Sequence, residues 1–178
     1  MNTEKLSERK AATLCVLHII KEAHDAWPAI YKRLKEGFGE IENGRMAPVD
    51  LGLAAIARNI IAIRNVFSKE QSDRIQKWVL EYLDAEDWGE YGKYAVEEVK
   101  KYRKFQEVAD DGKSGGDSLS AVPSLLLYKL FGKRLRDFEV AGSINPLLLM
   151  MLGGILTLLA GTWDWRAIKD KLCLEEET

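Results

Sequence analysis

Two histidines and two acidic residues near the N-terminus are the side chains in this sequence best suited to chemistry. They are His18, Glu22, His24 and Asp25. His18 and Glu22 are one helical turn apart, so their side chains can share a face. Helical Glu and His residues bind metals in four-helix bundles, but such sites need matching ligands from the facing helices. The sequence has only 2 histidines, both in this cluster. We therefore predict no metal here, and a metal-dependent hydrolase using the His18–Asp25 cluster is the third functional hypothesis.

Other motifs of catalytic or nucleotide-binding type are incomplete. Gly112, Lys113 and Ser114 match the end of a phosphate-binding loop, but that pattern needs a glycine where this sequence has Glu107. Acidic neighbours such as Glu97 and Glu98 lie among lysines, where we expect them to be solvated. Acid–base catalysis needs carboxylates whose environments separate their pKa values. The sequence thus predicts a protein that is not an enzyme and has no cofactor.

Two arginines interrupt a segment that is otherwise apolar. Arg58 and Arg64 lie within residues 48–67, and an internal charge without a partner is costly. One interpretation is a clamp for an anion or carboxylate in a pocket. The other is a structural salt bridge, or a side chain whose charged end reaches water. We expect the second interpretation to hold.

Two basic stretches are candidates for binding a polyanion, because lysine and arginine neutralise phosphates and exposed aromatic rings stack on bases. The candidate residues are Lys100, Lys101, Arg103, Lys104, Lys133, Arg134 and Arg136. Two observations count against such binding. The formal net charge is −2, and the aromatic residues Tyr102 and Phe105 lie on an apolar stripe that predicts burial. A nucleic-acid-binding subunit of a ribonucleoprotein or DNA complex is therefore the second hypothesis.

Residues 146–163 contain no charged side chain. A helix that spans a bilayer needs about 20 mostly apolar residues, so the segment is at the lower limit for a membrane anchor. Gly153, Thr157 and Gly161 recur every fourth residue, and a face of small side chains lets two helices approach closely in a membrane or in a soluble core. We expect a core or subunit-interface role, with these three residues as interface candidates. A membrane anchor is the less favoured alternative.

The periodicity of the apolar residues predicts an all-α fold. The expected helices cover residues 5–24, 48–67, 69–84, 90–109, 121–131 and 146–163. Pro28 should kink or restart the first helix, whose apolar face is expected to include Leu14, Leu17 and His24. Ser68 and Asn145 are typical helix caps. A linker rich in glycine and serine is expected near residues 110–120.

Length and composition bound the organisation of the chain. A chain of 178 residues favours one domain over residues 1–178. We predict a bundle of about six helices, with the two largely apolar helices 48–67 and 146–163 at its centre. Cys15 and Cys173 form no disulfide framework, as is typical of a reducing compartment. The polar N-terminal residues lack an apolar stretch of signal-peptide type, so we expect a cytoplasmic protein.

The leading hypothesis is a non-catalytic helical interaction protein that self-associates or is a subunit of a larger assembly. Its basis is the amount of apolar helix, because apolar surface that a monomer cannot bury usually marks a contact site. The expected partner is a second copy or another protein. We recognise no protein family in the sequence, and no motif identifies the partner, a ligand in the bundle or a pathway.

Overall fold

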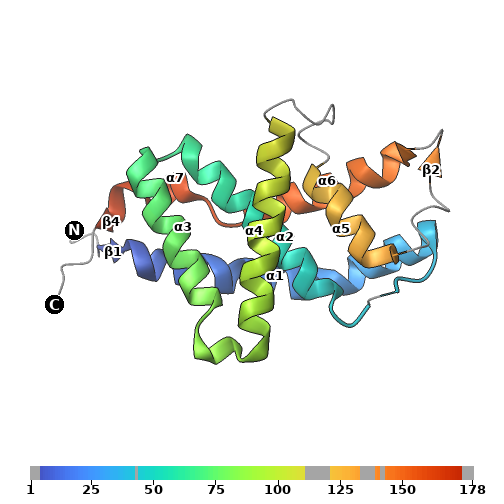
Figure 1. The fold of residues 1–178 in the computed structure, drawn as a ribbon, viewed down its shortest axis with the longest axis horizontal. Coiled ribbons are helices and arrows are strands. Elements are labelled where there is room, and N and C mark those ends of the chain that lie inside the picture. Colours follow the sequence, from blue (N-terminus) through green and yellow to red (C-terminus); the bar gives the residue numbers. More distant parts are fainter. Residues whose placement is uncertain (1–4, 43, 111–120, 133–138, 141–142, 174–178) are drawn as a thin grey trace.

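The computed structural model describes residues 5–42, 44–110, 121–132, 139–140 and 143–173, and it is an all-α helical bundle (Figure 1). Its longer helices are α1 (Glu8–Phe38), α2 (Ala47–Ala62), α3 (Lys69–Leu83), α4 (Glu90–Asp110), α5 (Ala121–Phe131) and α6 (Pro146–Gly161). Short 3-10 turns follow α2 (Ile63–Asn65) and precede α4 (Glu86–Trp88). The linker expected near 110–120 lies almost entirely outside the described residues.

Helix α1 continues through Pro28 without a break, so the predicted restart of the helix at this point is wrong. Pro28 is exposed, and a carbonyl that a proline frees can bond to water at such a position. Ser7 caps the helix by accepting a hydrogen bond from the backbone N–H of Lys10, at 3.2 Å.

The predicted apolar face of α1 is wrong at three of its positions. Leu14, Leu17 and His24 are exposed, and the buried face is formed largely by smaller residues. These are Ala11, Ala12, Cys15, Val16, Ile19, Ala23, Ile30 and Leu34. Alanines and a cysteine allow close approach of the neighbouring helices, and α1 packs on α2 and α3. The position of this face depends on the partner helices, which the periodicity of one segment does not reveal.

Helix α2 is the central helix of the bundle. It packs against α1, α4, α5 and α6, and Figure 1 shows it near the middle of the bundle. Most of its residues are buried, among them Leu51, Leu53, Ile56 and Ile60. A helix that is apolar nearly all round requires cover on every side. The prediction of a central helix is confirmed for α2, whereas only four residues of α6 are buried.

Caps and short strands fix the ends of the remaining helices. Ser68 accepts a hydrogen bond from the N–H of Gln71 at 3.3 Å, and Asn145 accepts one from Leu147 at 2.9 Å, so both predicted caps are confirmed. Strand β1 (Leu6–Ser7) pairs in parallel with β4 (Leu172–Cys173). This pair brings the first and last described segments together (Figure 1). Strands β2 (Glu139–Val140) and β3 (Ser143–Ile144) pair antiparallel just before α6.

A buried asparagine joins α2 to the end of α6. The amide nitrogen of Asn59 donates to the carbonyls of Ala160 and Trp163, at 2.7 and 3.1 Å. Its amide oxygen accepts from the indole N–H of Trp165 at 2.6 Å and from the Cys15 thiol at 3.3 Å. The side-chain amide therefore uses its two donors and accepts two hydrogen bonds. Burial of Cys15 raises the pKa of its thiol well above the ordinary value.

We expect Asn59→Ala to lower the free energy of unfolding by about 2–4 kcal/mol, because the indole N–H of Trp165 loses its acceptor and two carbonyls lose their donor. Urea unfolding followed by circular dichroism measures this loss. The matched control is Asn65→Ala, an exposed asparagine, for which a change within about 0.5 kcal/mol is expected. Equal losses in both variants would contradict the structural role of the Asn59 amide.

Candidate interaction surface

Helix α6 has one buried face and one exposed face. Leu148, Leu152, Leu156 and Leu159 are buried, and the helix packs on α2, α5 and α1. On the opposite face, residues follow one another in steps of three and four and form what we call the α6 stripe. Its members are Leu147, Met150, Gly154, Leu158 and Gly161. Apolar residues on both faces are the reason that the sequence of α6 shows no amphipathic pattern.

The α6 stripe is strongly exposed. Leu147, Met150 and Leu158 keep 71%, 72% and 74% of their surface accessible. A Cβ atom built on Gly154 would meet no atom within 4 Å, so the backbone is open there. Single exposed leucines are ordinary, but a contiguous apolar face is the usual mark of a contact site. This face is the best candidate for a functional surface.

The three small residues that were proposed as interface candidates do not all lie on the exposed face of α6. Gly153 faces α5, where a Cβ atom would lie 3.6 Å from a Pro123 ring carbon. Thr157 and Gly161 are exposed, beside or on the α6 stripe. The Thr157 hydroxyl donates to the carbonyl of Gly153 at 2.8 Å, which satisfies it within the helix. The centre of the exposed face is therefore formed by larger residues that the sequence pattern did not single out.

One stretch of the described residues, Pro146–Lys171, is long and apolar enough to cross a membrane by length and composition alone. Only 22% of its most apolar window is buried. The helix at the core of a soluble protein has a similar composition but is mostly buried. Length and composition therefore do not distinguish a membrane anchor from a surface for protein contact. The packing of α6 on the bundle gives additional information.

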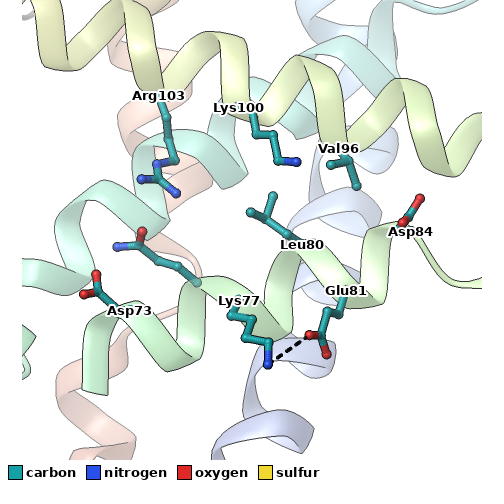
Figure 2. Close-up of a pocket in the computed structure, with 9 residues that line it drawn as sticks. Asp73, Lys77, Leu80, Glu81, Asp84, Val96, Lys100 and Arg103 are labelled. Carbon is teal, nitrogen blue, oxygen red and sulfur yellow. Dashed lines mark ion pairs between the residues drawn. The ribbon is translucent and has the colours of Figure 1, made fainter. Parts of the chain in front are cut away.

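Two of the four basic candidates on α4 lie near acidic residues of the same helix. Arg103 lies 3.4 Å from Glu107, and Lys101 lies 4.0 Å from Glu98. Lys100 and Arg103 face the cleft between α3 and α4, where Asp73, Glu81 and Asp84 come from α3 (Figure 2). This cleft, about 390 Å³ in volume, contains charges of both signs. Lys104 is exposed, and Lys133, Arg134 and Arg136 lie outside the described residues.

The histidine cluster is dispersed. His24 is exposed, and Asp25 pairs with Lys21. His18 lies instead beside the end of α6, with its ring centroid 6.0 Å from that of Trp163. Within the part of the chain that the structure describes, there is no group of three or more His, Cys, Asp or Glu residues that could hold a metal ion.

A buried ionic cluster joins α2, α4 and α5, and sequence reasoning missed it. The Lys129 ammonium lies 3.1 Å from the fully buried Asp50 and 2.6 Å from Glu98. It also donates to the Tyr94 hydroxyl at 2.7 Å, and that hydroxyl donates to Asp50. Burial disfavours the ammonium, but the bonds to Glu98, Tyr94 and Asp50 outweigh this cost and raise the pKa of Lys129. Desolvation raises the pKa values of Tyr94 and Tyr102.

The residues of this cluster line none of the three cavities described for this structure. Ion pairs of this kind position helices, because removal of one partner leaves the other charge buried. The cluster thus fixes the packing of α4 and α5 on α2, the helix that also supports α6.

The two arginines of the apolar segment differ in their surroundings. Arg64 pairs with Glu107 at 3.2 Å, as the structural interpretation expects. Arg58 is half-buried and has no ion pair or hydrogen bond among the described residues. Desolvation lowers the pKa of its guanidinium. The interpretation as a structural salt bridge therefore holds for Arg64. The charge of Arg58 has no such partner among the described residues.

Comparisons with known proteins give no relative for this chain. No family model, no curated protein and no solved structure matches it. Its function must therefore be inferred from its own surfaces.

We expect Lys129→Met to lower the free energy of unfolding at neutral pH by about 3–5 kcal/mol, because Asp50 and Glu98 would remain buried without their cation. The stabilisation that depends on the raised pKa of Lys129 is complete below the unfolded pKa near 10.4. It is lost as pH rises through the higher folded pKa. The difference from the unmodified protein should therefore be constant between about pH 6 and 9 and narrow above about pH 10.5.

Chemical denaturation at several pH values measures this difference. The control is Lys101→Met, which removes an exposed lysine near the same Glu98 and is expected to cost at most about 1 kcal/mol. A Lys129→Met protein as stable as the Lys101→Met protein would show that the cluster does not hold the helices together.

Proposed function

We propose that this chain is a non-catalytic interaction protein that self-associates through the α6 stripe. The observation that supports the proposal is the exposure of Leu147, Met150 and Leu158 on one face of a helix whose other face is packed on the bundle. Covering such a face removes apolar surface from water, which stabilises the contact by about 25 cal/mol per Å². A second copy supplies a face of matching shape and polarity.

Glycines favour a helix-on-helix contact between two copies of α6. Gly154 and Gly161 lie on the stripe, and a Cβ on either would meet no atom within 4 Å. Their missing side chains allow another helix to approach the backbone, while Met150 and Leu158 pack on each side. Two-fold symmetry makes such a contact self-complementary.

The size of the stripe indicates a weak association. A helix of 16 residues is about 24 Å long, and a strip about 10 Å wide along it covers roughly 240 Å² in projection. Stable interfaces bury about 800 Å² on each partner. The described exposed apolar residues on neighbouring helices include Leu14 and Leu17 on α1 and Tyr128 on α5. Self-association should therefore depend on protein concentration.

A single-sided face also favours a protein contact over a membrane span. A helix that crosses a bilayer leaves the bundle and must satisfy its polar groups by itself. To do so, α6 would have to break the bonds of Asn59 to Ala160 and Trp163 and uncover the leucines that pack on α2. The exposed stripe can be covered without any of these losses.

We expect the unmodified protein to show a concentration-dependent increase in mass, and Leu158→Glu to remain monomeric, because a carboxylate in an apolar contact would be desolvated. Sedimentation velocity over a dilution series, without detergent, measures both. The position is 74% exposed, so the variant should fold normally.

The matched control is Val108→Glu on α4, which introduces the same charge at an exposed valine and should associate like the unmodified protein. A monomer at every concentration would refute self-association, as would equal effects of the two substitutions. Co-sedimentation of the unmodified monomer with phosphatidylcholine vesicles would then assign the stripe to a membrane surface.

A further inference from the structure

A cavity of about 420 Å³ lies where the C-terminal ends of α2 and α6 meet the segment that leads into α7 (Trp165–Ile168). Small and aromatic side chains form much of its wall, and two arginines, Arg58 and Arg166, also line it. Pockets of this volume commonly hold small molecules, with an apolar wall and a few polar groups that set the orientation. The cavity adjoins the C-terminal end of the α6 stripe, because Gly161 belongs to both.

Arg58 is the first sign that the cavity is built for an anion. Its guanidinium is half-buried and has no ion-pair or hydrogen-bond partner among the described residues. A cation that is taken partly out of water without a partner costs free energy. An arginine that only complemented the dipole of α2 would contact a terminal carbonyl, and Arg58 makes no such bond in the part of the chain that the structure describes.

Trp163 is the second feature of the cavity, because it lines the same space as Arg58. Its indole N–H is buried, so the residue contributes aromatic surface to the cavity and not a hydrogen-bond donor. An aromatic wall beside a guanidinium suits a ligand that combines a flat ring with a negative charge.

The balance of charges selects the class of anion. Two guanidinium groups, those of Arg58 and Arg166, line the cavity together with one carboxylate, that of Asp164. One oxygen of Asp164 already accepts a hydrogen bond from the backbone N–H of Arg166, at 2.9 Å. The net charge of one positive unit fits a monoanion better than a doubly charged phosphate. A planar guanidinium also matches the two oxygens of a carboxylate.

We propose that this cavity binds a small monocarboxylate with a flat apolar body, such as an aromatic acid. The carboxylate pairs with Arg58, while the ring lies against Trp163 and the apolar wall formed by Val66, Ala62 and Ala160. Binding supplies the partner that Arg58 lacks. The mixed-charge cleft between α3 and α4 (Figure 2) offers no comparable excess of cations.

Isothermal titration calorimetry with 2-naphthoate tests this proposal on the full-length protein. We expect saturable one-to-one binding, and at least ten-fold weaker binding of the neutral 2-naphthamide, which has the same shape without the charge. Inorganic phosphate should also bind at least ten-fold more weakly than 2-naphthoate. No binding of 2-naphthoate, or equal binding of the acid and the amide, would overturn the proposal.

Two matched variants locate the site. Arg58→Gln should weaken 2-naphthoate binding at least ten-fold without loss of thermal stability, because the arginine has no described partner to lose. Arg64→Gln removes the same charge from the following turn, where the arginine is already paired with Glu107, and should leave the affinity unchanged. Equal effects of the two substitutions would show that only the general positive field attracts the acid. Repeating the titration with Leu158→Glu separates ligand binding from self-association.

Discussion

The side-chain amide of Asn59 is the constraint on which the arrangement of α6 depends. It lies inside an apolar helix, where an unpaired amide would cost several kcal/mol. Its four hydrogen bonds reach Cys15, Ala160, Trp163 and Trp165. These bonds can be made together only if α6 ends beside α2 and the chain then turns back into α7. One buried polar group therefore sets which face of α6 is covered and which is exposed.

The same constraint creates the cavity with Arg58. Because Asn59 draws the carbonyls of Ala160 and Trp163 toward α2, the chain after α6 folds over the end of α2 instead of leaving the bundle. Trp163 and Arg58 then line one space, since Arg58 is the residue just before Asn59. The adjacent residues Asn59 and Arg58 therefore have different roles. The buried Asn59 joins α2 to the end of α6, whereas the half-buried Arg58 lines the cavity between them.

Local signals in the sequence predicted the helices well, and the packing less well. Caps such as Ser68 and Asn145 act within a few residues, so their effect can be recognised in one segment. The face of α1 could not be recognised in this way. Large residues such as Leu14 and Leu17 were expected inside, but close packing on α2 and α3 requires the alanines and Cys15 there. The choice is made by helices that lie elsewhere in the sequence.

Long-range pairing explains the other misses. Lys129 was not a candidate in the sequence analysis, and its role appears only when α5 packs on α2 and brings it to Asp50. Arg58 and Arg64 were indistinguishable in the sequence, since both interrupt the same apolar run. Glu107 on α4 reaches Arg64 and not Arg58. The candidate ligand cavity is therefore marked by Arg58, which has no ion-pair partner among the described residues. The residues next to Arg58 in the sequence cannot show whether such a partner exists.

The two faces of α6 add information that its composition does not contain. A segment without charges fits a bilayer helix, a central core helix and a contact helix equally well, because composition does not say which face of the helix is covered. In the structure, Asn59 and the leucines that pack on α2 hold one face of α6 against the bundle. A core helix would have no exposed side, and a spanning helix would have no side held by polar bonds. A helix that is packed on one side and exposed on the other needs cover from one direction only, and this is the reason that we propose a second protein surface as its partner.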